Sequence, residues 1–520
     1  MKQYQMTRTS RPMHRWTVQY INILLAFAGV STISIATAQQ SPRRLEGLTW
    51  SPSTGGAGAV CQRPGAGPGT LPNAIINGRG FKQPGDNESE LTIAAFGDIV
   101  VAGFNDCAGA HMPSLRNGTV GWAFSTDGGQ TWRDRGSQGA LEKVQPSDFG
   151  VWSDPSLAVD AAGSFYFSNM YTEVGAGFYP KSITVHTGHY DLISGNVIWG
   201  PPSLAFLSPA GVSGADKPHI SVDPNTSGAG VIVYVAFTQN TQNVNGAISV
   251  VRSTDGARTW SEPVIVSTSH VTEPPLGAIP RVGPNGEIYV AWEGNWGGNA
   301  GRTIKIVKSS TMNWPSFSPE LIVSSVIKTD PIPFFNPGRM NDFPTMGVDT
   351  SAGPNRGRVY IAWNDGGFGS GCPDALRASN KIGSILLSHS PDGLSNWSSP
   401  PTMINDDGHP SLTCTDHFFP WLSVDPNGGV HLGWYDRRLR SPPGRYDLTD
   451  VFAATFTVAG GISTNVRLTS CSFSTNVQAN CQPGFGDYNG GYATANRFHY
   501  AWGDGRNGDP DSYTGGLILP

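Results

Sequence analysis

Beyond its first forty residues the sequence lacks long apolar runs, and it lacks the 3.6-residue apolar periodicity that marks amphipathic helices. Short runs rich in Val, Ile, Tyr, Phe and Trp lie instead between turn signals, and Gly (66) and Pro (40) are abundant. These features exclude a helical bundle and predict a mature chain that is almost entirely β.

Charge is also scarce and is not clustered. Only 14% of the residues are charged, the formal net charge is -5, and no run of Lys and Arg resembles a nucleic-acid-binding surface. We therefore expect no nucleic-acid partner.

The one long apolar run lies at the N-terminus. Basic residues between Lys2 and Arg15 precede an apolar stretch from about Val18 to Ile35, which is followed by Ala36-Thr37-Ala38. This order predicts a signal peptide over residues 1–38, with an uncleaved membrane anchor as the alternative. We expect a secreted, periplasmic or cell-surface protein with no stable membrane span after cleavage.

Cysteine is rare, and the six cysteines form no CxxC pair, so a zinc site has no support. An even number of cysteines in an exported chain indicates disulfides. Because Cys471 and Cys481 close a short loop, they are the most plausible pair, and Cys372–Cys414 and Cys61–Cys107 follow by elimination. Spacing alone leaves the connectivity open.

One short strand pattern, such as Tyr289-Val290-Ala291-Trp292, recurs seven times. The last residues of the copies are 104, 169, 237, 292, 363, 434 and 502, with gaps of 65, 68, 55, 71, 71 and 68 residues. Most copies are followed by a third strand, a turn and a fourth strand. A repeat of this size predicts a β-propeller built of four-stranded antiparallel blades. Seven blades fit the count, with six as the alternative.

The last copy has only three strands before the chain ends at Pro520. An incomplete blade would leave an exposed sheet edge. We therefore predict that part of the segment from about Leu48 to Phe81 closes the ring as a fourth strand. That strand would lie in a Gly/Pro-rich segment, residues 39–88, ahead of the propeller at 89–520.

The turns between third and fourth strands share a motif. Ser125–Trp132 and Ser253–Trp260 read S-x-D-G-x-x-T-W, and Ser390–Trp397 has Asn in place of Thr. The Asp accepts local backbone hydrogen bonds, the Gly supplies unusual dihedrals and the Trp packs over the turn. These turns resemble the Asp box, or BNR repeat, of the sialidase superfamily over residues 90–520. The resemblance implies a propeller whose boxes lie on the face opposite the active site.

The residues after the recurrent strand should converge at that other face, the mouth of the ring. Two positions beyond the strand end, four of the seven copies carry a carboxylate, namely Asp106, Asp365, Asp436 and Asp504. The strands before the recurrent one begin with Asp154, Asp216, Asp342, Asp416 and Asp487, near Trp152, His219, Phe343, His417, Phe418 and Tyr488. Carboxylates mixed with aromatic surfaces are typical of a sugar site.

The side chains that depart from the repeat are Glu293, Tyr435, Arg437, Arg438 and His417. The sialidase resemblance implies a Tyr nucleophile activated by a Glu, an Asp acid/base and three arginines around the substrate carboxylate. Tyr435, Glu293 and one of Asp106 or Asp154 can be assigned these catalytic roles, with Asp436 as a further carboxylate. The substrate-binding candidates are Arg437, Arg438, Arg506, Asp365, Asp504, His417 and Trp152. The chain has no F/Y-R-I-P segment ahead of the first blade, where the family places its first arginine.

A structural interpretation of the same residues is that each repeated Asp bonds its own loop and pairs with Arg437, Arg438 or Arg506. No cofactor is required. Calcium is the candidate ion, because carboxylates at the mouth are hard oxygen ligands. The acidic loop of Asp504, Asn507, Asp509 and Asp511 fits no EF-hand spacing, however.

We expect an exported sialidase-superfamily propeller that binds or hydrolyses glycans at its mouth as a candidate glycoside hydrolase. The alternative is a non-catalytic propeller that binds a protein or a polysaccharide. Three arginines converging on one point, with a Tyr–Glu contact, would favour the enzyme. Carboxylates tied to neighbouring loops would favour the binding protein.

Overall fold

The computed structural model describes residues 65–520 except 79–84, 109–117, 137–140, 146–147, 149, 173–181, 208–213, 242–243, 269, 271, 297–300, 337, 368–380, 409–413, 440–446 and 482–483. The predicted signal peptide thus lies outside the described residues. Among the residues that are described, no helix is both long and apolar enough to cross a membrane.

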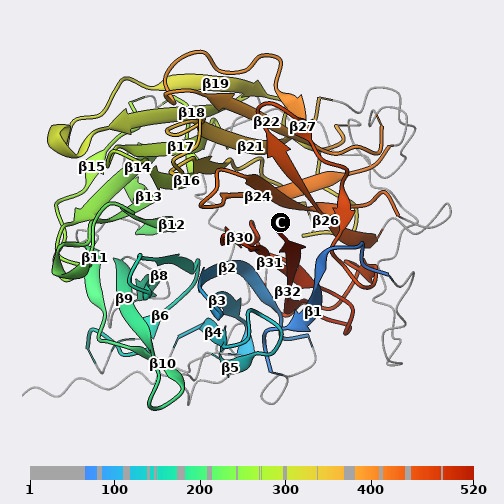
Figure 1. Ribbon diagram of the computed structural model, residues 1–520, viewed down its shortest axis with the longest axis horizontal. Coiled ribbons are helices and arrows are strands. Elements are labelled where there is room, and N and C mark those ends of the chain that lie inside the picture. The colour runs from blue at the N-terminus through green and yellow to red at the C-terminus, as the bar shows by residue number, and fades with distance from the viewer. Residues whose placement is uncertain are drawn as a thin grey trace, which may run out of the picture. The chain divides into compact units, whose positions relative to one another are not determined.

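The strands form seven antiparallel sheets arranged as a ring of blades (Figure 1). Blade 1 contains β2 (Glu88–Phe96), β3 (Ile99–Asp106), β4 (Val120–Ser125) and β5 (Arg133–Gly136). Blade 2 contains β6 (Gly150–Val151), β7 (Ser156–Val159), β8 (Ser164–Thr172), β9 (Ser182–Asp191), β10 (Asn196–Trp199) and β11 (Ser203–Leu207). Blade 3 contains β12 (Ala215–Val222), β13 (Val233–Thr241), β14 (Val244–Ser253) and β15 (Val264–Ile265), with the 3-10 helix η2 (Gly228–Gly230). Blade 4 contains β16 (Leu276–Val282), β17 (Ile288–Gly294), β18 (Arg302–Ser309) and β19 (Leu321–Val326), with η3 (Thr311–Asn313).

The last three blades complete the ring. Blade 5 contains β20 (Thr345–Val348), β21 (Val359–Asp365), β22 (Ser384–Ser390) and β23 (Thr402–Met403). Blade 6 contains β24 (His417–Val424), β25 (Val430–Asp436), β26 (Leu448–Thr457), β27 (Gly461–Ile462), β28 (Val466–Arg467) and β29 (Phe473–Ser474). Blade 7 contains β30 (Gly490–Ala493), β31 (Arg497–Asp504), β32 (Asp511–Ile518) and the N-terminal strand β1 (Thr70–Ile75), which pairs with β32. The predicted seven blades and the predicted closing strand are both confirmed.

The recurrent strand is apolar at almost every position because both of its faces are buried between blades. In β17, Tyr289 and Ala291 pack into the apolar cluster shared with blade 5, whereas Val290 and Trp292 pack into the cluster shared with blade 3. Successive strand residues point to opposite faces, so a strand sandwiched between two neighbours needs apolar side chains on both. This requirement explains the sequence pattern from which the fold was predicted.

Most innermost strands are irregular where they begin, at the mouth. In β2, β12, β16 and β24 the pairing register shifts at a bulge, and the first bulged residue has a positive φ: Glu90 (54°), Lys217 (53°), Gly277 (71°) and Phe419 (52°). Asp154 (φ 54°) holds the same place ahead of β7. In blades 5 and 7, the pairing register shows that Phe343 and Tyr488 occupy the equivalent position. Bulges redirect side chains, so this position brings one residue from every blade toward the axis.

A hydroxyl group two residues further on links several blades to the next. Thr92 accepts a hydrogen bond from the Leu157 N–H (2.9 Å) and Thr345 accepts one from the Leu422 N–H (2.9 Å). Ser156 does the same in blade 2, where it accepts from the Ile220 N–H (3.2 Å). The equivalent residues in blades 3 and 6 are His219 and Trp421, which lack such a hydroxyl.

The disulfide between Cys107 and Cys481 joins the end of β3 in blade 1 to the segment ahead of β30 in blade 7. The predicted pairs Cys61–Cys107 and Cys471–Cys481 are therefore wrong. The short-loop argument failed because ring closure brings together residues 374 positions apart. Cys414 and Cys471 are also disulfide-bonded. Cys372 lies outside the described residues, and so does the predicted Cys372–Cys414 pair.

We predict that the double variant C107S/C481S loses about 2–5 kcal/mol of unfolding free energy, because this bond restricts a very long loop of the unfolded chain. Denaturant unfolding of the oxidised proteins measures the difference. If the β1–β32 pairing already closed the ring sufficiently, the loss would stay below about 1 kcal/mol, and the disulfide would not be needed for closure.

Candidate functional site

A small cavity of about 20 Å³ lies on the axis at the mouth end of the innermost strands, with room for little more than one water molecule. Residues at the bulge position of four blades contribute to its wall, namely Gly277, Phe343, Phe419 and Tyr488. The lining residues are His219, Gly277, Asn341, Phe343, Pro344, Asn364, Phe419, Pro420, Trp421, Asp487 and Tyr488. Aromatic rings thus lie beside amide, imidazole and carboxylate groups in one place.

Two buried polar atoms of this wall have no hydrogen-bond partner, Nε2 of His219 and Nε1 of Trp421. Nδ1 of His219 lies 3.0 Å from the Ala278 carbonyl, and burial together with Arg281 lowers the His219 pKa to about 3. The ring is therefore neutral, with Nδ1 donating and Nε2 able to accept. The indole N–H of Trp421 is a donor, and the two ring centroids are 5.7 Å apart. This pair of groups complements a hydroxyl, which both donates and accepts.

Next to the cavity, Lys217 connects acidic groups from three blades. Its Nζ is 2.6 Å from Oε1 of Glu90, 2.8 Å from Oδ2 of Asp487 and 3.5 Å from Oδ2 of Asp154. All four side chains are buried. Arg339, from the segment between β19 and β20, binds both carboxylate oxygens of Asp487 and keeps 32% of its side chain exposed. We call these five residues the axial ion cluster.

The cluster contains three carboxyl groups and two cations. Burial and the adjacent Asp154, which shares a hydrogen bond with Glu90, raise the pKa of Glu90 well above its usual value. Burial opposes ionisation of Asp487, but Lys217 and Arg339 outweigh it and lower the pKa of Asp487. A proton retained on Glu90 would leave two carboxylates against two cations, so the buried cluster can be electrically neutral.

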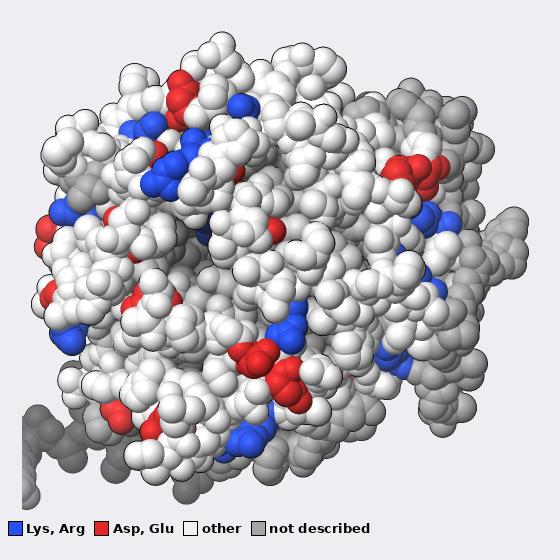
Figure 2. Space-filling model, in the orientation of Figure 1, with Lys and Arg blue, Asp and Glu red and all other residues white. Residues whose placement is uncertain are grey.

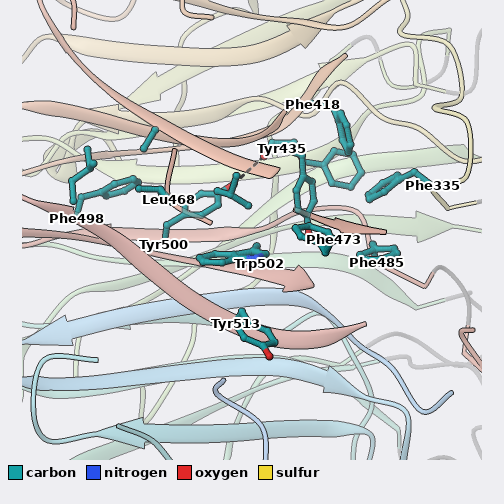
Figure 3. Close-up of a cluster of buried hydrophobic side chains, with 14 of the residues drawn as sticks. Phe335, Phe418, Tyr435, Leu468, Phe473, Phe485, Phe498, Tyr500, Trp502 and Tyr513 are labelled. Atoms are coloured by element: carbon teal, nitrogen blue, oxygen red, sulfur yellow. Dashed lines mark hydrogen bonds between the residues drawn. The ribbon is translucent and has the colours of Figure 1, made fainter. Parts of the chain in front are cut away.

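Tyr435 and Glu293 are not brought together. The Tyr435 hydroxyl donates to the Gly503 carbonyl (2.8 Å), and Figure 3 shows its ring among other aromatic side chains. Burial raises its pKa well above 10. Glu293 lies in a different buried group, where it pairs with Arg302 (2.6 Å) and accepts from the Asp342 N–H (3.0 Å).

The three arginines proposed from the sequence do not converge on one point. Arg437 is buried and donates to the Pro333 carbonyl (2.8 Å) and to two threonine hydroxyls. Arg438 pairs with Asp436 (2.8 Å), and Arg506 pairs with Asp504 (2.7 Å). Each guanidinium is thus held by its own blade or by a neighbouring segment.

Most of the predicted carboxylates bond their own strand ends or loops. Asp436 and Asp504 accept from the indole N–H two residues earlier, Trp434 (3.0 Å) and Trp502 (2.9 Å). Asp106 and Asp365 accept from backbone N–H groups two residues later, Ala108 (3.0 Å) and Gly367 (2.8 Å). The structural interpretation therefore describes these four residues.

Of the other predicted residues, Asp154 and Asp487 belong to the axial ion cluster, and His219, Phe343 and Tyr488 line the cavity. His417 is buried with its Nε2 3.1 Å from Asp407, away from the residues that line the cavity. The backbone N–H of Trp152 donates to the Met170 carbonyl (2.8 Å). Glu90, Lys217 and Arg339 were missed. The signal for Lys217 is the Pro that often follows the bulged position, as in Asp154-Pro155 and Lys217-Pro218. Glu90 is followed by Leu91 and lacks that signal.

No group of three or more His, Cys, Asp or Glu within the described residues is arranged to hold a metal ion. In the acidic loop after β31, Asn507 donates to Asp511 (2.6 Å) and Asp504 binds Arg506, so these side chains have protein partners. On the face shown in Figure 2, Lys and Arg lie singly or in small groups, often near Asp and Glu. That arrangement is not a continuous basic surface.

No protein-family model and no curated protein matches this chain. Among solved structures, a protein of unknown function from Dyadobacter fermentans is 14% identical, with 87% of this chain and 100% of that chain covered and a TM-score of 0.44. An α-L-arabinofuranosidase of Fusarium graminearum is 10% identical (86% and 98% covered, TM-score 0.41), and a Hadza microbial sialidase is 13% identical (70% and 65%, TM-score 0.40). Similarities this weak do not bear on what the chain binds or whether it is catalytic.

Proposed function

We propose that the protein is an exported carbohydrate-binding propeller whose ligand lies at the mouth end of the ring axis. The axial cavity carries this proposal, because it combines aromatic rings with an unused acceptor on His219 and an unused donor on Trp421. Saccharides present apolar ring faces and hydroxyl groups, and such a wall complements both.

The size of the cavity defines how a sugar would fit. About 20 Å³ accommodates one hydroxyl or hydroxymethyl group, not a whole ring. The remainder of the sugar would lie over Phe343 and Arg339, which stay partly exposed next to the cavity. Binding rather than sialidase-type hydrolysis is favoured because Arg437, Arg438 and Arg506 are held apart and Tyr435 is bonded to a main-chain carbonyl.

Glycoside hydrolysis at the same mouth is the second candidate, and Glu90 is the observation that favours it. A carboxyl group with a raised pKa beside a carboxyl group with a lowered pKa is the arrangement of an acid catalyst and its partner. Glu90 would protonate the glycosidic oxygen, and Asp487, whose pKa is lowered, would act as the base or nucleophile.

A glycan array followed by titration tests the binding proposal. We predict that W421F, which keeps a ring but removes the N–H donor, weakens binding about tenfold, the equivalent of about 1.4 kcal/mol. W132F is the matched control, because the Trp132 N–H donates to Gly129 within an Asp box. Equal affinities for the two variants, or no glycan bound by the wild type, would contradict the proposal. Turnover abolished by E90Q would establish the second candidate.

A further inference from the structure

Arg281 lies on β16, the innermost strand of blade 4. Its guanidinium carbon is 5.9 Å from the centre of the Trp421 ring. Its only hydrogen bond within the described residues is an internal one, from Nη1 to the Pro280 carbonyl (2.8 Å). The side chain is deep in the ring but still partly exposed. Several of its five N–H donors are therefore unused.

Three other deeply placed arginines have carboxylate partners, whereas the buried Arg437 donates to a carbonyl and two hydroxyls. Arg302 pairs with Glu293 (2.6 Å), Arg467 with Asp450 (2.6 Å) and Arg506 with Asp504 (2.7 Å). No carboxylate of the described residues forms an ion pair with Arg281. Burial without a counter-ion lowers the pKa of Arg281 to about 10. Tyr492 has the opposite effect and raises this pKa. A cation deep in the ring that no carboxylate of the described residues balances favours a counter-ion from outside the chain.

The strand positions level with Arg281 carry one tyrosine and otherwise small residues. Counted from the bulge, Arg281 and Tyr492 occupy the same level of the ring, four residues deeper than the cavity residues Gly277 and Tyr488. The equivalent residues of the other blades are all small, namely Ala94, Ala158, Ser221, Gly347 and Ser423. Burial raises the pKa of Tyr492 to about 12, so its hydroxyl stays protonated and can donate.

We propose that this level of the axis is a binding site for a small oxyanion, a carboxylate or a tetrahedral anion such as sulfate or phosphate, held by Arg281 with Tyr492. A guanidinium offers paired N–H donors that match two oxygens of such an anion. Neither Arg281 nor Tyr492 lines the cavity proposed to bind a sugar, although Arg281 stacks on Trp421, which does. The proposed anion site does not depend on whether the protein binds glycans.

Thermal unfolding with sodium sulfate or sodium acetate, at ionic strength matched with sodium chloride, tests the site. For the wild type we expect a saturable rise of about 1–3 °C in Tm with the anion that fits, over the chloride reference. Whether sulfate or acetate produces it identifies the tetrahedral or the planar anion. R281M should lose this rise and, without added anion, should melt at the same temperature as the wild type or higher, because an unpaired buried charge is gone.

R252M is the matched control, since Arg252 also stacks on an indole, that of Trp314 at 5.0 Å. It should keep the anion response. Y492F tests the same site with the charge intact and should weaken the apparent anion affinity about threefold or more. A wild-type rise no larger than that in chloride, or an equal rise in R281M and R252M, would overturn the proposal. So would an R281M protein that melts well below the wild type, since Arg281 would then be a structural residue.

Discussion

K217M is expected to lower the free energy of unfolding by about 3–5 kcal/mol at pH 7, the cost typical of removing one partner from a buried ion cluster. Lys217 is the cation that contacts Glu90, Asp154 and Asp487 together. Without it, only Arg339 remains to balance the carboxylates, and Arg339 contacts Asp487 alone among them. Methionine fills a similar volume, so the loss would report charge rather than a cavity.

The loss should also depend on pH. In the folded wild type the pKa of Asp487 is lowered from its usual value of 3.8. Asp487 therefore contributes its full stabilisation above pH 3.8, and this contribution is lost as the pH falls through the lowered pKa of the folded protein. In K217M the carboxylates can become neutral only by binding protons, so the difference between the two proteins should shrink toward acid pH. Urea unfolding at pH 7 and pH 5 measures both effects.

K308M is the control for this experiment. Lys308 is a surface residue that donates to the Asp392 carbonyl and lies over the Tyr289 ring, and its replacement should cost no more than about 1 kcal/mol. A K217M protein as stable as K308M at pH 7 would show that the axial ion cluster does not hold blades 1, 2, 3 and 7 together.

The fold could be predicted because its determinants are local and repeated. In blades 4 to 7 every copy of the recurrent strand is apolar on both faces because both faces are buried, as in Tyr360–Trp363. The turn motifs locate the third and fourth strands. The three-stranded last copy required a closing strand, which is β1 at Thr70–Ile75. The blade inferences used residues that are close together in the sequence, and the closing strand followed from the need to complete the last sheet.

The candidate site could be predicted only in part, because it is made by ring closure. Lys217 and Glu90 are 127 positions apart, and Arg339 and Asp487 are 148 apart. Asp436 and Asp504 were predicted as site residues because they recur at the same position of the repeat. They recur because each accepts a hydrogen bond from the indole N–H two residues earlier, which is a structural role. Departures from the repeat were no better a guide, since Glu293 and Tyr435 lie outside the site. The aromatic residues placed beside the inner-strand starts, His219, Phe343 and Tyr488, do line the cavity.

Glu293 was proposed as a catalytic residue, but its surroundings predict a different, measurable role in stability. Glu293 and Asp342 are both fully buried against one guanidinium, that of Arg302, at 2.6 and 2.8 Å. Two carboxylates and one buried cation leave an excess negative charge, so one proton is retained by the pair. Burial is the main reason that the pKa of Glu293 is raised to about 8 from 4.5, with Asp342 adding to it and Arg302 opposing it.

A group whose pKa is higher in the folded protein than in the unfolded chain stabilises the fold fully at pH values below its unfolded-state pKa. This stabilisation is lost as the pH rises through the folded-state pKa. For Glu293 the window runs from about pH 4.5 to about pH 8. Within it, the wild type should lose up to about 1.4 kcal/mol per pH unit relative to a variant that cannot ionise. E293Q is such a variant, since its amide has the shape of the protonated acid and can still accept from the Asp342 N–H.

We therefore expect E293Q to match the wild type near pH 4.5 and to become more stable than it by about 2–4 kcal/mol near pH 8. Urea unfolding of both proteins at intervals between these values gives the difference. E273Q is the control, because Glu273 pairs with Lys305 at a partly exposed site, and its difference from the wild type should stay within about 1 kcal/mol throughout. If E293Q instead ran parallel to the wild type, Glu293 would be ionised in the folded protein, and its candidacy as a catalytic base would regain support.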